Sequence, residues 1–209
     1  CIRDSLKGTV DFMLTPLLTL LITGFLTFMG LGPILRTAGE WLGMGLANLY
    51  DFAGPVAGFL FGLVYSPIVI TGLHQSFPPI ETMLWNEGGS FVFPIASMAN
   101  IAQGGVALAV YFLARSEKLK GLAGASGISA LFGITEPAIF GVNLRLRWPF
   151  YIGMAASAIA SAFIAIFGVL ADALGAAGLI GFVSVPRFVP TFLLCGVISF
   201  VVAFVGAYL

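Results

Sequence analysis

Five stretches of the chain contain no charged side chain, and each is long enough to cross a lipid bilayer. A transmembrane α-helix needs about 20 consecutive apolar residues to span the hydrocarbon core. The stretches are Phe12 to Leu35, Phe52 to Leu73, Gly88 to Ala114, Trp148 to Ala171, and Phe188 to Leu209. We therefore expect an all-α membrane protein, built as a polytopic helical bundle that is largely covered by lipid.

The amino-acid composition excludes several other classes of protein. Only 9% of the 209 residues are charged, whereas a soluble domain carries about 25%. Nine basic and nine acidic side chains give no net charge, so nothing indicates nucleic-acid binding. The two cysteines, Cys1 and Cys195, predict no disulfide framework, and a single histidine predicts no metal site. The chain has no phosphate-binding glycine loop, and we expect no cofactor.

The segment from Thr71 to Trp85 is apolar, yet it does not resemble a simple membrane span. It contains the only histidine, His74, next to Gln75, and the proline pair Pro78-Pro79 follows. Because prolines lack a backbone donor, we expect the pair to end a helix. Irregular backbone at membrane depth is tolerated only where protein buries it or where it lines a wet cavity. We therefore predict a re-entrant hairpin near residues 71–85, with a polar tip.

A second segment of this kind runs from Gly121 to Asn143. It contains Glu136 immediately before Pro137. The residue before a proline is disfavoured in a helix, so we expect Glu136 to lie at a break in the chain. This segment predicts a second re-entrant hairpin, near residues 121–143.

Basic side chains on both sides of this second segment support a re-entrant path. Three precede it and two follow it: Arg115, Lys118, Lys120, Arg145 and Arg147. If the segment crossed the membrane completely, the two groups would lie on opposite faces. If it re-enters, all five lie on one face, which the positive-inside rule makes cytoplasmic.

Two weaker patterns concern the helices themselves. Apolar residues recur at near-helical spacing from Ala38 to Asp51, which predicts an interfacial amphipathic helix. Small residues recur every fourth position in two places, which predicts close helix packing rather than a functional site. They are Gly54, Gly58 and Gly62, and then Gly153, Ser157, Ser161 and Ala165.

Glu136 is the first candidate for chemistry, because a carboxylate at membrane depth usually faces a cavity or a partner. The alternative is a structural carboxylate that caps the hairpin. His74 is the second candidate, although a lone histidine is more often structural. Asn100 and Gln103 either line a cavity or hydrogen-bond another helix, and Glu81 is a minor candidate near the membrane interface.

Residues Gly133 to Gly141, GITEPAIFG, resemble the GITEPAI[FY]G signature of a known family. This family is the membrane-embedded enzyme IIC of bacterial sugar phosphotransferase systems, in the glucose superfamily. Three more stretches are similar to its sucrose and β-glucoside branch: Thr15 to Leu20 (TPLLTL), Gly72 to Phe77 (GLHQSF) and Phe93 to Asn100 (FPIASMAN). The motifs occur in the family's order, and the resemblance covers essentially the whole chain.

The resemblance implies a multi-pass homodimer in the bacterial inner membrane. Each protomer of such a protein has an interface half and a transport half, with re-entrant hairpins around the sugar. Residues 1–37 would hold the last helix of the interface half, residues 38–51 the amphipathic connection, and residues 52–209 the transport half. We expect the chain to be a fragment, without the early membrane helices and without the IIB domain that carries a phosphorylated cysteine.

The resemblance also implies a function and a site. The family's sugar-binding histidine and glutamate map onto His74 and Glu136, and Thr135, Gln75 and Asn100 complete the expected sugar-binding set. Such a permease takes up a disaccharide, with sucrose ahead of trehalose and β-glucosides, and couples uptake to phosphorylation by the phosphocysteine of a IIB domain. Glu136 would orient the accepting sugar hydroxyl, and transfer would require the IIB domain.

Two other functions stay open on the residues alone. Broken helices at the membrane midplane also occur in ion-coupled secondary transporters, in which Glu136 and His74 would relay protons. A non-catalytic membrane anchor would need neither side chain.

Overall fold

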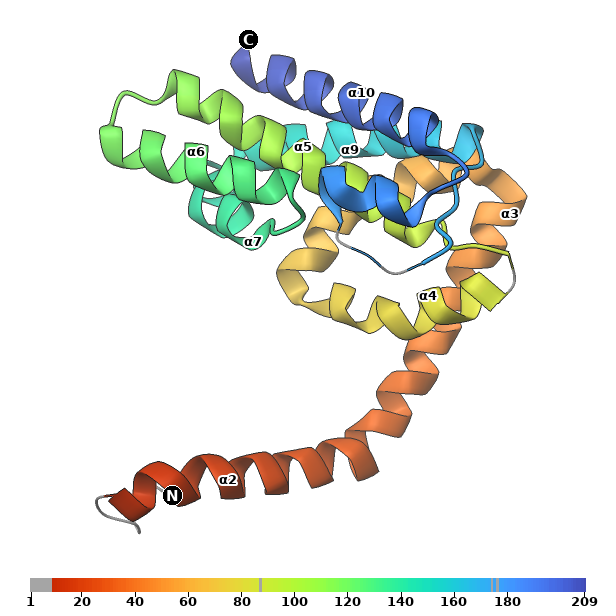
Figure 1. Ribbon diagram of the computed structural model, residues 1–209, viewed down its shortest axis with the longest axis vertical. Coiled ribbons are helices and arrows are strands. Elements are labelled where there is room, and N and C mark those ends of the chain that lie inside the picture. Colours follow the sequence, from red (N-terminus) through yellow and green to blue (C-terminus); the bar gives the residue numbers. More distant parts are fainter. Residues whose placement is uncertain (1–8, 87, 174, 176) are drawn as a thin grey trace. The chain divides into compact units, whose positions relative to one another are not determined.

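The computed structural model describes residues 9–86, 88–173, 175 and 177–209 (Figure 1). Within these residues the chain is helical, and its one β-type pairing is an isolated antiparallel bridge between Ser90 and Ala171. The expected all-α fold is therefore confirmed. The chain forms two compact units, Cys1–Met44 and Gly45–Leu209.

The first unit consists of α2 (Thr9–Leu26), the π-helical turn η1 (Thr27–Leu31) and the beginning of α3 (Gly32–Thr71). Its apolar helix spans Leu14–Gly30, which is shorter than the predicted stretch. Many large apolar side chains in it are exposed, among them Phe28, at 83%. Exposed apolar side chains in this number fit lipid or another protein chain rather than water.

Helix α3 continues through the predicted amphipathic segment. Residues 38–51 are helical as expected, but they belong to α3 rather than to a separate helix. The helical geometry is interrupted at Ala53, with φ −139° and ψ 41°. Pro55 accounts for this interruption, because a proline inside a helix lacks a donor and clashes with the preceding turn. The placement of this segment at the membrane interface stays a prediction.

Among the described residues, four helices are long and apolar enough to cross a membrane, and they match four of the five predicted stretches. They are Phe52–Thr71 of α3, α5 (Val92–Leu113), α9 (Trp148–Ile166) and α10 (Val189–Tyr208). Both α9 and α10 carry a proline in the first turn, where its missing donor costs nothing. Gly168, at φ 60°, ends α9, because its left-handed backbone satisfies the last carbonyls of the helix.

Helix α5 is the centre of the second unit. It packs against α6 (Glu117–Leu131), α9 and α10, and the 3₁₀ helix η4 (Gly178–Ser184) also contacts it (Figure 1). Of the membrane-spanning window of α5, 83% of the residues are buried inside the protein, compared with 28% for α10. The hydroxyl of Ser199 on α10 donates to the Met98 carbonyl of α5 at 2.8 Å. Protein rather than lipid therefore surrounds α5.

Helices α3 and α9 approach closely where Gly58 and Gly62 of one small-residue stripe face the other stripe. A Cβ atom on Gly58 would lie 2.6 Å from the Ser161 carbonyl oxygen and 2.8 Å from the Ala165 Cβ. A Cβ atom on Gly62 would lie 2.9 Å from the Ser157 carbonyl oxygen. The predicted packing role is confirmed for Gly58 and Gly62 against Ser157, Ser161 and Ala165, whereas Gly54 has no atom within 4 Å of an added Cβ among the described residues and Gly153 faces Gln103 of α5.

The segment after α3 corrects one expectation. The chain turns at Gly72, with φ 78°, continues as the 3₁₀ helix η2 (Leu73–Ser76) and then forms α4 (Phe77–Asn86). Pro78 and Pro79 thus lie in the first turn of α4, so they begin a helix instead of ending one. They are tolerated there because the first amides of a helix have no intrahelical acceptor. Entry of residues 71–85 into the membrane stays a prediction.

The segment between α5 and α9 folds back on itself. After α6 the chain breaks and then forms three short helical pieces: α7 (Glu136–Ala138), the π-helix η3 (Ile139–Asn143) and α8 (Leu144–Leu146). Both α7 and η3 pack against α6. The segment therefore has the shape of a helical hairpin, and its re-entry into the membrane stays a prediction.

Candidate functional site

The break between α6 and α7 places Thr135 and Glu136 together, as the sequence predicts. Gly133 adopts φ 97°, a left-handed conformation that favours glycine. Its carbonyl oxygen accepts a hydrogen bond of 3.4 Å from the side-chain nitrogen of Asn100 on α5. Asn100 is thus brought to the same break, and three of the predicted site residues lie within one local structure.

Thr135 and Glu136 differ in their access to the surroundings. Thr135 is buried, at 4% exposure, whereas Glu136, the first residue of α7, is exposed. In the part of the chain that the structure describes, no hydrogen bond or ion pair occupies the Glu136 carboxylate. A carboxylate that only capped the hairpin would accept local amide hydrogen bonds, so the capping alternative finds no support here.

His74 and Gln75 lie at the other break, on η2. The Nε2 atoms of the two side chains are 3.1 Å apart, within hydrogen-bonding distance. The second ring nitrogen of His74, Nδ1, is buried and has no hydrogen-bond partner among the described residues. This is unusual, since a buried polar atom normally finds a partner.

Tyr65 relates the two breaks to each other. Phe77, at the start of α4, stacks on the Tyr65 ring with centroids 6.1 Å apart and planes at 22°. One turn later, Glu81 comes close enough to act electrostatically on the Tyr65 hydroxyl, and so does Glu136 from the other break. No hydrogen bond joins His74 directly to Glu136 among the described residues.

Glu81 is more deeply buried than the sequence indicates. Its side chain is 5% exposed, and its Oε2 atom lacks a hydrogen-bond partner among the described residues. Burial raises the pKa of Glu81 to about 7, because desolvation disfavours the charged form. A carboxyl group of this kind gains or loses its proton near neutral pH.

Gln103 follows one of its two predicted alternatives. It hydrogen-bonds other elements of the fold: its Nε2 lies 3.0 Å from the Ser66 hydroxyl and 3.4 Å from the Phe150 carbonyl. Asn143 donates to Gln103 in addition. Gln103 is therefore a structural group of the core.

Sequence reasoning missed Tyr65, Ser66 and Asn143. A tyrosine and a serine in an apolar run carry no signal of their own. Asn143 offered a signal, because it ends the second predicted hairpin as a lone amide among apolar residues. Within the described residues, no group of three or more potential metal ligands occurs.

Comparison with known proteins decides the family. Residues 1–158 match the sequence profile described as "Phosphotransferase system, EIIC". The chain belongs to this EIIC family. The four apolar helices agree with its place as an integral membrane component.

Several curated proteins resemble this EIIC chain over nearly its whole length. A "PTS system sucrose-specific EIIBCA component" from Pediococcus pentosaceus is 53% identical and covers 98% of the chain. A "PTS system sucrose-specific EIIBC component" from Staphylococcus xylosus is 55% identical over 88% of the chain. A "PTS system trehalose-specific EIIBC component" from Bacillus subtilis is 42% identical over 95% of it.

The EIIC chain spans only part of these relatives. It covers 32% of the Pediococcus protein, 39% of the Staphylococcus protein and 43% of the trehalose-specific protein. No solved structure matches the chain.

Proposed function

We propose that the chain forms the sugar-translocating part of a phosphotransferase system that takes up a disaccharide, with sucrose as the first candidate. The observation that carries this proposal is the Glu136 carboxylate, which is exposed and makes no hydrogen bond among the described residues. It lies beside Thr135 at a break that Asn100 of the central helix α5 binds by a hydrogen bond. Carboxylate, hydroxyl and amide groups in one place suit recognition of sugar hydroxyls. The names of the similar proteins support sucrose ahead of trehalose.

In this proposal the sugar lies between the two breaks. His74 contributes its imidazole ring, Gln75 and Asn100 offer amide groups, and Glu136 accepts a hydrogen bond from the reacting hydroxyl. Glu81 and Glu136 both act electrostatically on Tyr65, so the two segments that carry them lie within electrostatic range of one residue. The aromatic rings of Tyr65 and Phe77 close one side of the proposed sugar site.

The transfer step follows from this arrangement. The C6 hydroxyl oxygen of the glucosyl unit attacks the phosphorus of the IIB phosphocysteine, and the phosphorus–sulfur bond breaks. The cysteine leaves as a thiolate, and the hydroxyl proton passes to the Glu136 carboxylate. Because phosphoryl transfer depends mainly on positioning and charge stabilisation, a few well-placed polar contacts suffice.

The test is the substitution Glu136→Gln in the full-length protein. Phosphoryl-donor-dependent sucrose uptake should fall by about 100-fold or more, since general-base groups contribute about 10²–10⁴ to rate. Glu117→Gln is the matched control, because Glu117 is also an exposed glutamate in the first turn of a helix. Uptake at the wild-type rate in Glu136→Gln would contradict the assignment.

One observation favours a second candidate, an ion-coupled secondary sugar transporter. The buried Glu81, with its raised pKa, has the properties of a proton carrier. Uptake that collapses with an uncoupler, but persists when the phosphoryl donor is removed, would favour this candidate. Uptake that stops without the donor and ignores the uncoupler supports the phosphotransferase proposal.

The proposed working unit is a homodimer that acts with a phosphorylated IIB domain. The exposed apolar side chains of the first unit provide surface for a second copy of the chain. Light scattering of the full-length protein in detergent should give the mass of two copies, and the mass of one copy would contradict this assembly.

A further inference from the structure

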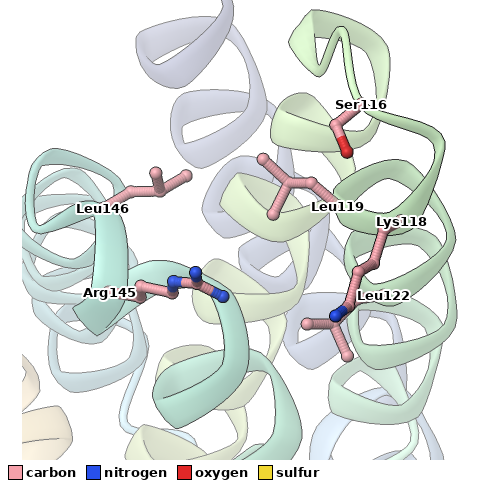
Figure 2. Close-up of a pocket in the computed structure, with 6 residues that line it drawn as sticks. All are labelled: Ser116, Lys118, Leu119, Leu122, Arg145 and Leu146. Carbon is pink, nitrogen blue, oxygen red and sulfur yellow. The ribbon is translucent and has the colours of Figure 1, made fainter.

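A pocket of about 310 Å³ lies between the start of α6 and the end of α8 (Figure 2). Ser116, Lys118, Leu119 and Leu122 line one wall, and Arg145 and Leu146 line the other. Figure 2 shows Leu119 and Leu146 extending toward each other from opposite walls, with the Arg145 guanidinium directed into the space between them. The pocket thus combines two cations with three leucines.

The pocket lies at the depth where two membrane spans end. Helix α5 ends at Leu113, three residues before Ser116, and α9 begins at Trp148, two residues after Leu146. Trp148 is 43% exposed, which is typical of the aromatic residues at a membrane–water boundary. A group bound in this pocket would therefore sit level with lipid headgroups.

The cations of the pocket are not neutralised within the described part of the chain. No carboxylate there forms an ion pair with Lys118 or Arg145, and Glu117 is not among the lining residues. The Ser116 hydroxyl makes no capping hydrogen bond to α6. Two free cations and a free hydroxyl together suit a phosphate group, which accepts several charge-assisted hydrogen bonds.

We propose that this pocket binds the phosphate group of an anionic phospholipid. Lys118, Arg145 and Ser116 contact the phosphate oxygens, and the leucines contact the glycerol and the upper acyl carbons. Basic pockets at the cytoplasmic ends of membrane helices suit such headgroups. The leucines favour an amphiphile over free phosphate, because apolar lining adds nothing to the binding of an inorganic ion. This binding does not depend on the proposed sugar transport.

The face that carries the pocket agrees with this ligand. Arg115, Lys120 and Arg147 surround the pocket in sequence, and the positive-inside rule places such a cluster in the cytoplasm. Anionic lipids in the cytoplasmic leaflet attract basic segments within a Debye length of the surface. The basic residues around the pocket would attract anionic lipids in general, and the pocket would bind one of these lipids in a defined position.

The experiment measures lipid binding to the full-length protein, purified in a nonionic detergent, by native mass spectrometry. The protein is titrated with dioleoyl phosphatidylglycerol, with dioleoyl phosphatidylcholine and with inorganic phosphate. Phosphatidylglycerol should bind at least about tenfold more tightly than phosphatidylcholine. The double variant Lys118→Gln/Arg145→Gln should bind phosphatidylglycerol at least about tenfold more weakly. Each basic side chain near an anionic surface contributes about fivefold in affinity.

Two control variants make the outcome decisive. Arg115→Gln removes an exposed cation from the same loop outside the pocket, and it should change binding by less than about twofold. Lys118→Arg/Arg145→Lys keeps both charges and should retain binding. Equal losses in Arg115→Gln and in the double variant would overturn the proposal, since they would indicate diffuse attraction. Inorganic phosphate that binds as tightly as the lipid, or equal binding of both lipids, would overturn it too.

Discussion

The side-chain nitrogen of Asn143 donates two hydrogen bonds to Gln103, at 2.8 Å to Oε1 and at 2.9 Å to the backbone oxygen. Gln103 donates in turn to Ser66 and to the Phe150 carbonyl, so that α3, α5, η3 and α9 meet in one buried network. Because η3 follows α7 directly, this network holds the segment that carries Glu136 on the central helix.

The first prediction concerns this network. Gln103→Leu keeps the side-chain volume but removes the side-chain partner of the Ser66 hydroxyl and of the Phe150 carbonyl, and one of the two hydrogen bonds that Asn143 donates. The free energy of unfolding should fall by about 2–4 kcal/mol, since each unsatisfied buried group costs about 1–3 kcal/mol. Thermal unfolding of the full-length protein in detergent measures the change.

Ser97→Ala is the control for Gln103→Leu. Ser97 is also buried on α5, but among the described residues its hydroxyl donates only to the Phe93 carbonyl of its own helix, at 3.0 Å. This change should cost less than about 1 kcal/mol. If both variants unfold at the same temperature, the network does not hold η3 in place.

The second prediction concerns the close approach of α3 to α9. Gly58→Ala would bring a Cβ within 2.6 Å of the Ser161 carbonyl oxygen, so the helices must move apart, at about 1–3 kcal/mol. Gly54→Ala is the matched control, because no atom of another described element lies within 4 Å of its added Cβ. Gly58→Ala should therefore unfold at a lower temperature than Gly54→Ala. Equal unfolding temperatures would contradict the close contact between α3 and α9 at Gly58.

The third prediction is a pH dependence of stability. The pKa of Glu81 is raised by burial to about 7, above its ordinary value of 4.5. The folded protein therefore holds this proton more tightly than the unfolded chain does. The stabilising contribution is complete below pH 4.5 and is lost as pH rises through 7, by up to about 3 kcal/mol.

Unfolding measured between pH 4.5 and pH 8 checks this dependence. Glu81→Gln should flatten the profile, because an amide does not titrate in this range. Glu117→Gln should leave it unchanged, since Glu117 is exposed. A profile that is the same in the wild-type and Glu81→Gln proteins would show that Glu81 does not carry the effect.

The fourth prediction concerns the break before Glu136. Gly133→Ala would strain a backbone at φ 97° and place a Cβ 2.5 Å from the Ala177 carbonyl oxygen. The strain, about 1–3 kcal/mol, should displace the break and raise the KM for sugar uptake about tenfold. Gly121→Ala, in open space on α6, should leave KM unchanged. Equal KM values in the two variants would show that the geometry of the break does not affect sugar binding.

Much of the fold followed from local sequence patterns. Long charge-free runs predicted four of the membrane helices, because the hydrophobic requirement of a bilayer acts on each helix separately. Pro137 likewise predicted a break beside Glu136, because the backbone restriction that a proline imposes is local. The proline pair at Pro78 misled the prediction, since a proline can begin a helix as well as end one.

The sequence by itself determined that this chain is helical, lies in a membrane and carries His74 and Glu136 at two breaks. Only the tertiary structure decided which helix is central: α5, the least apolar of the four spans, is the most buried. It also decided that Gln103 bonds other elements of the fold and that Glu81 is buried. These outcomes depend on which side chains meet across segments far apart in sequence, and local composition does not specify such contacts.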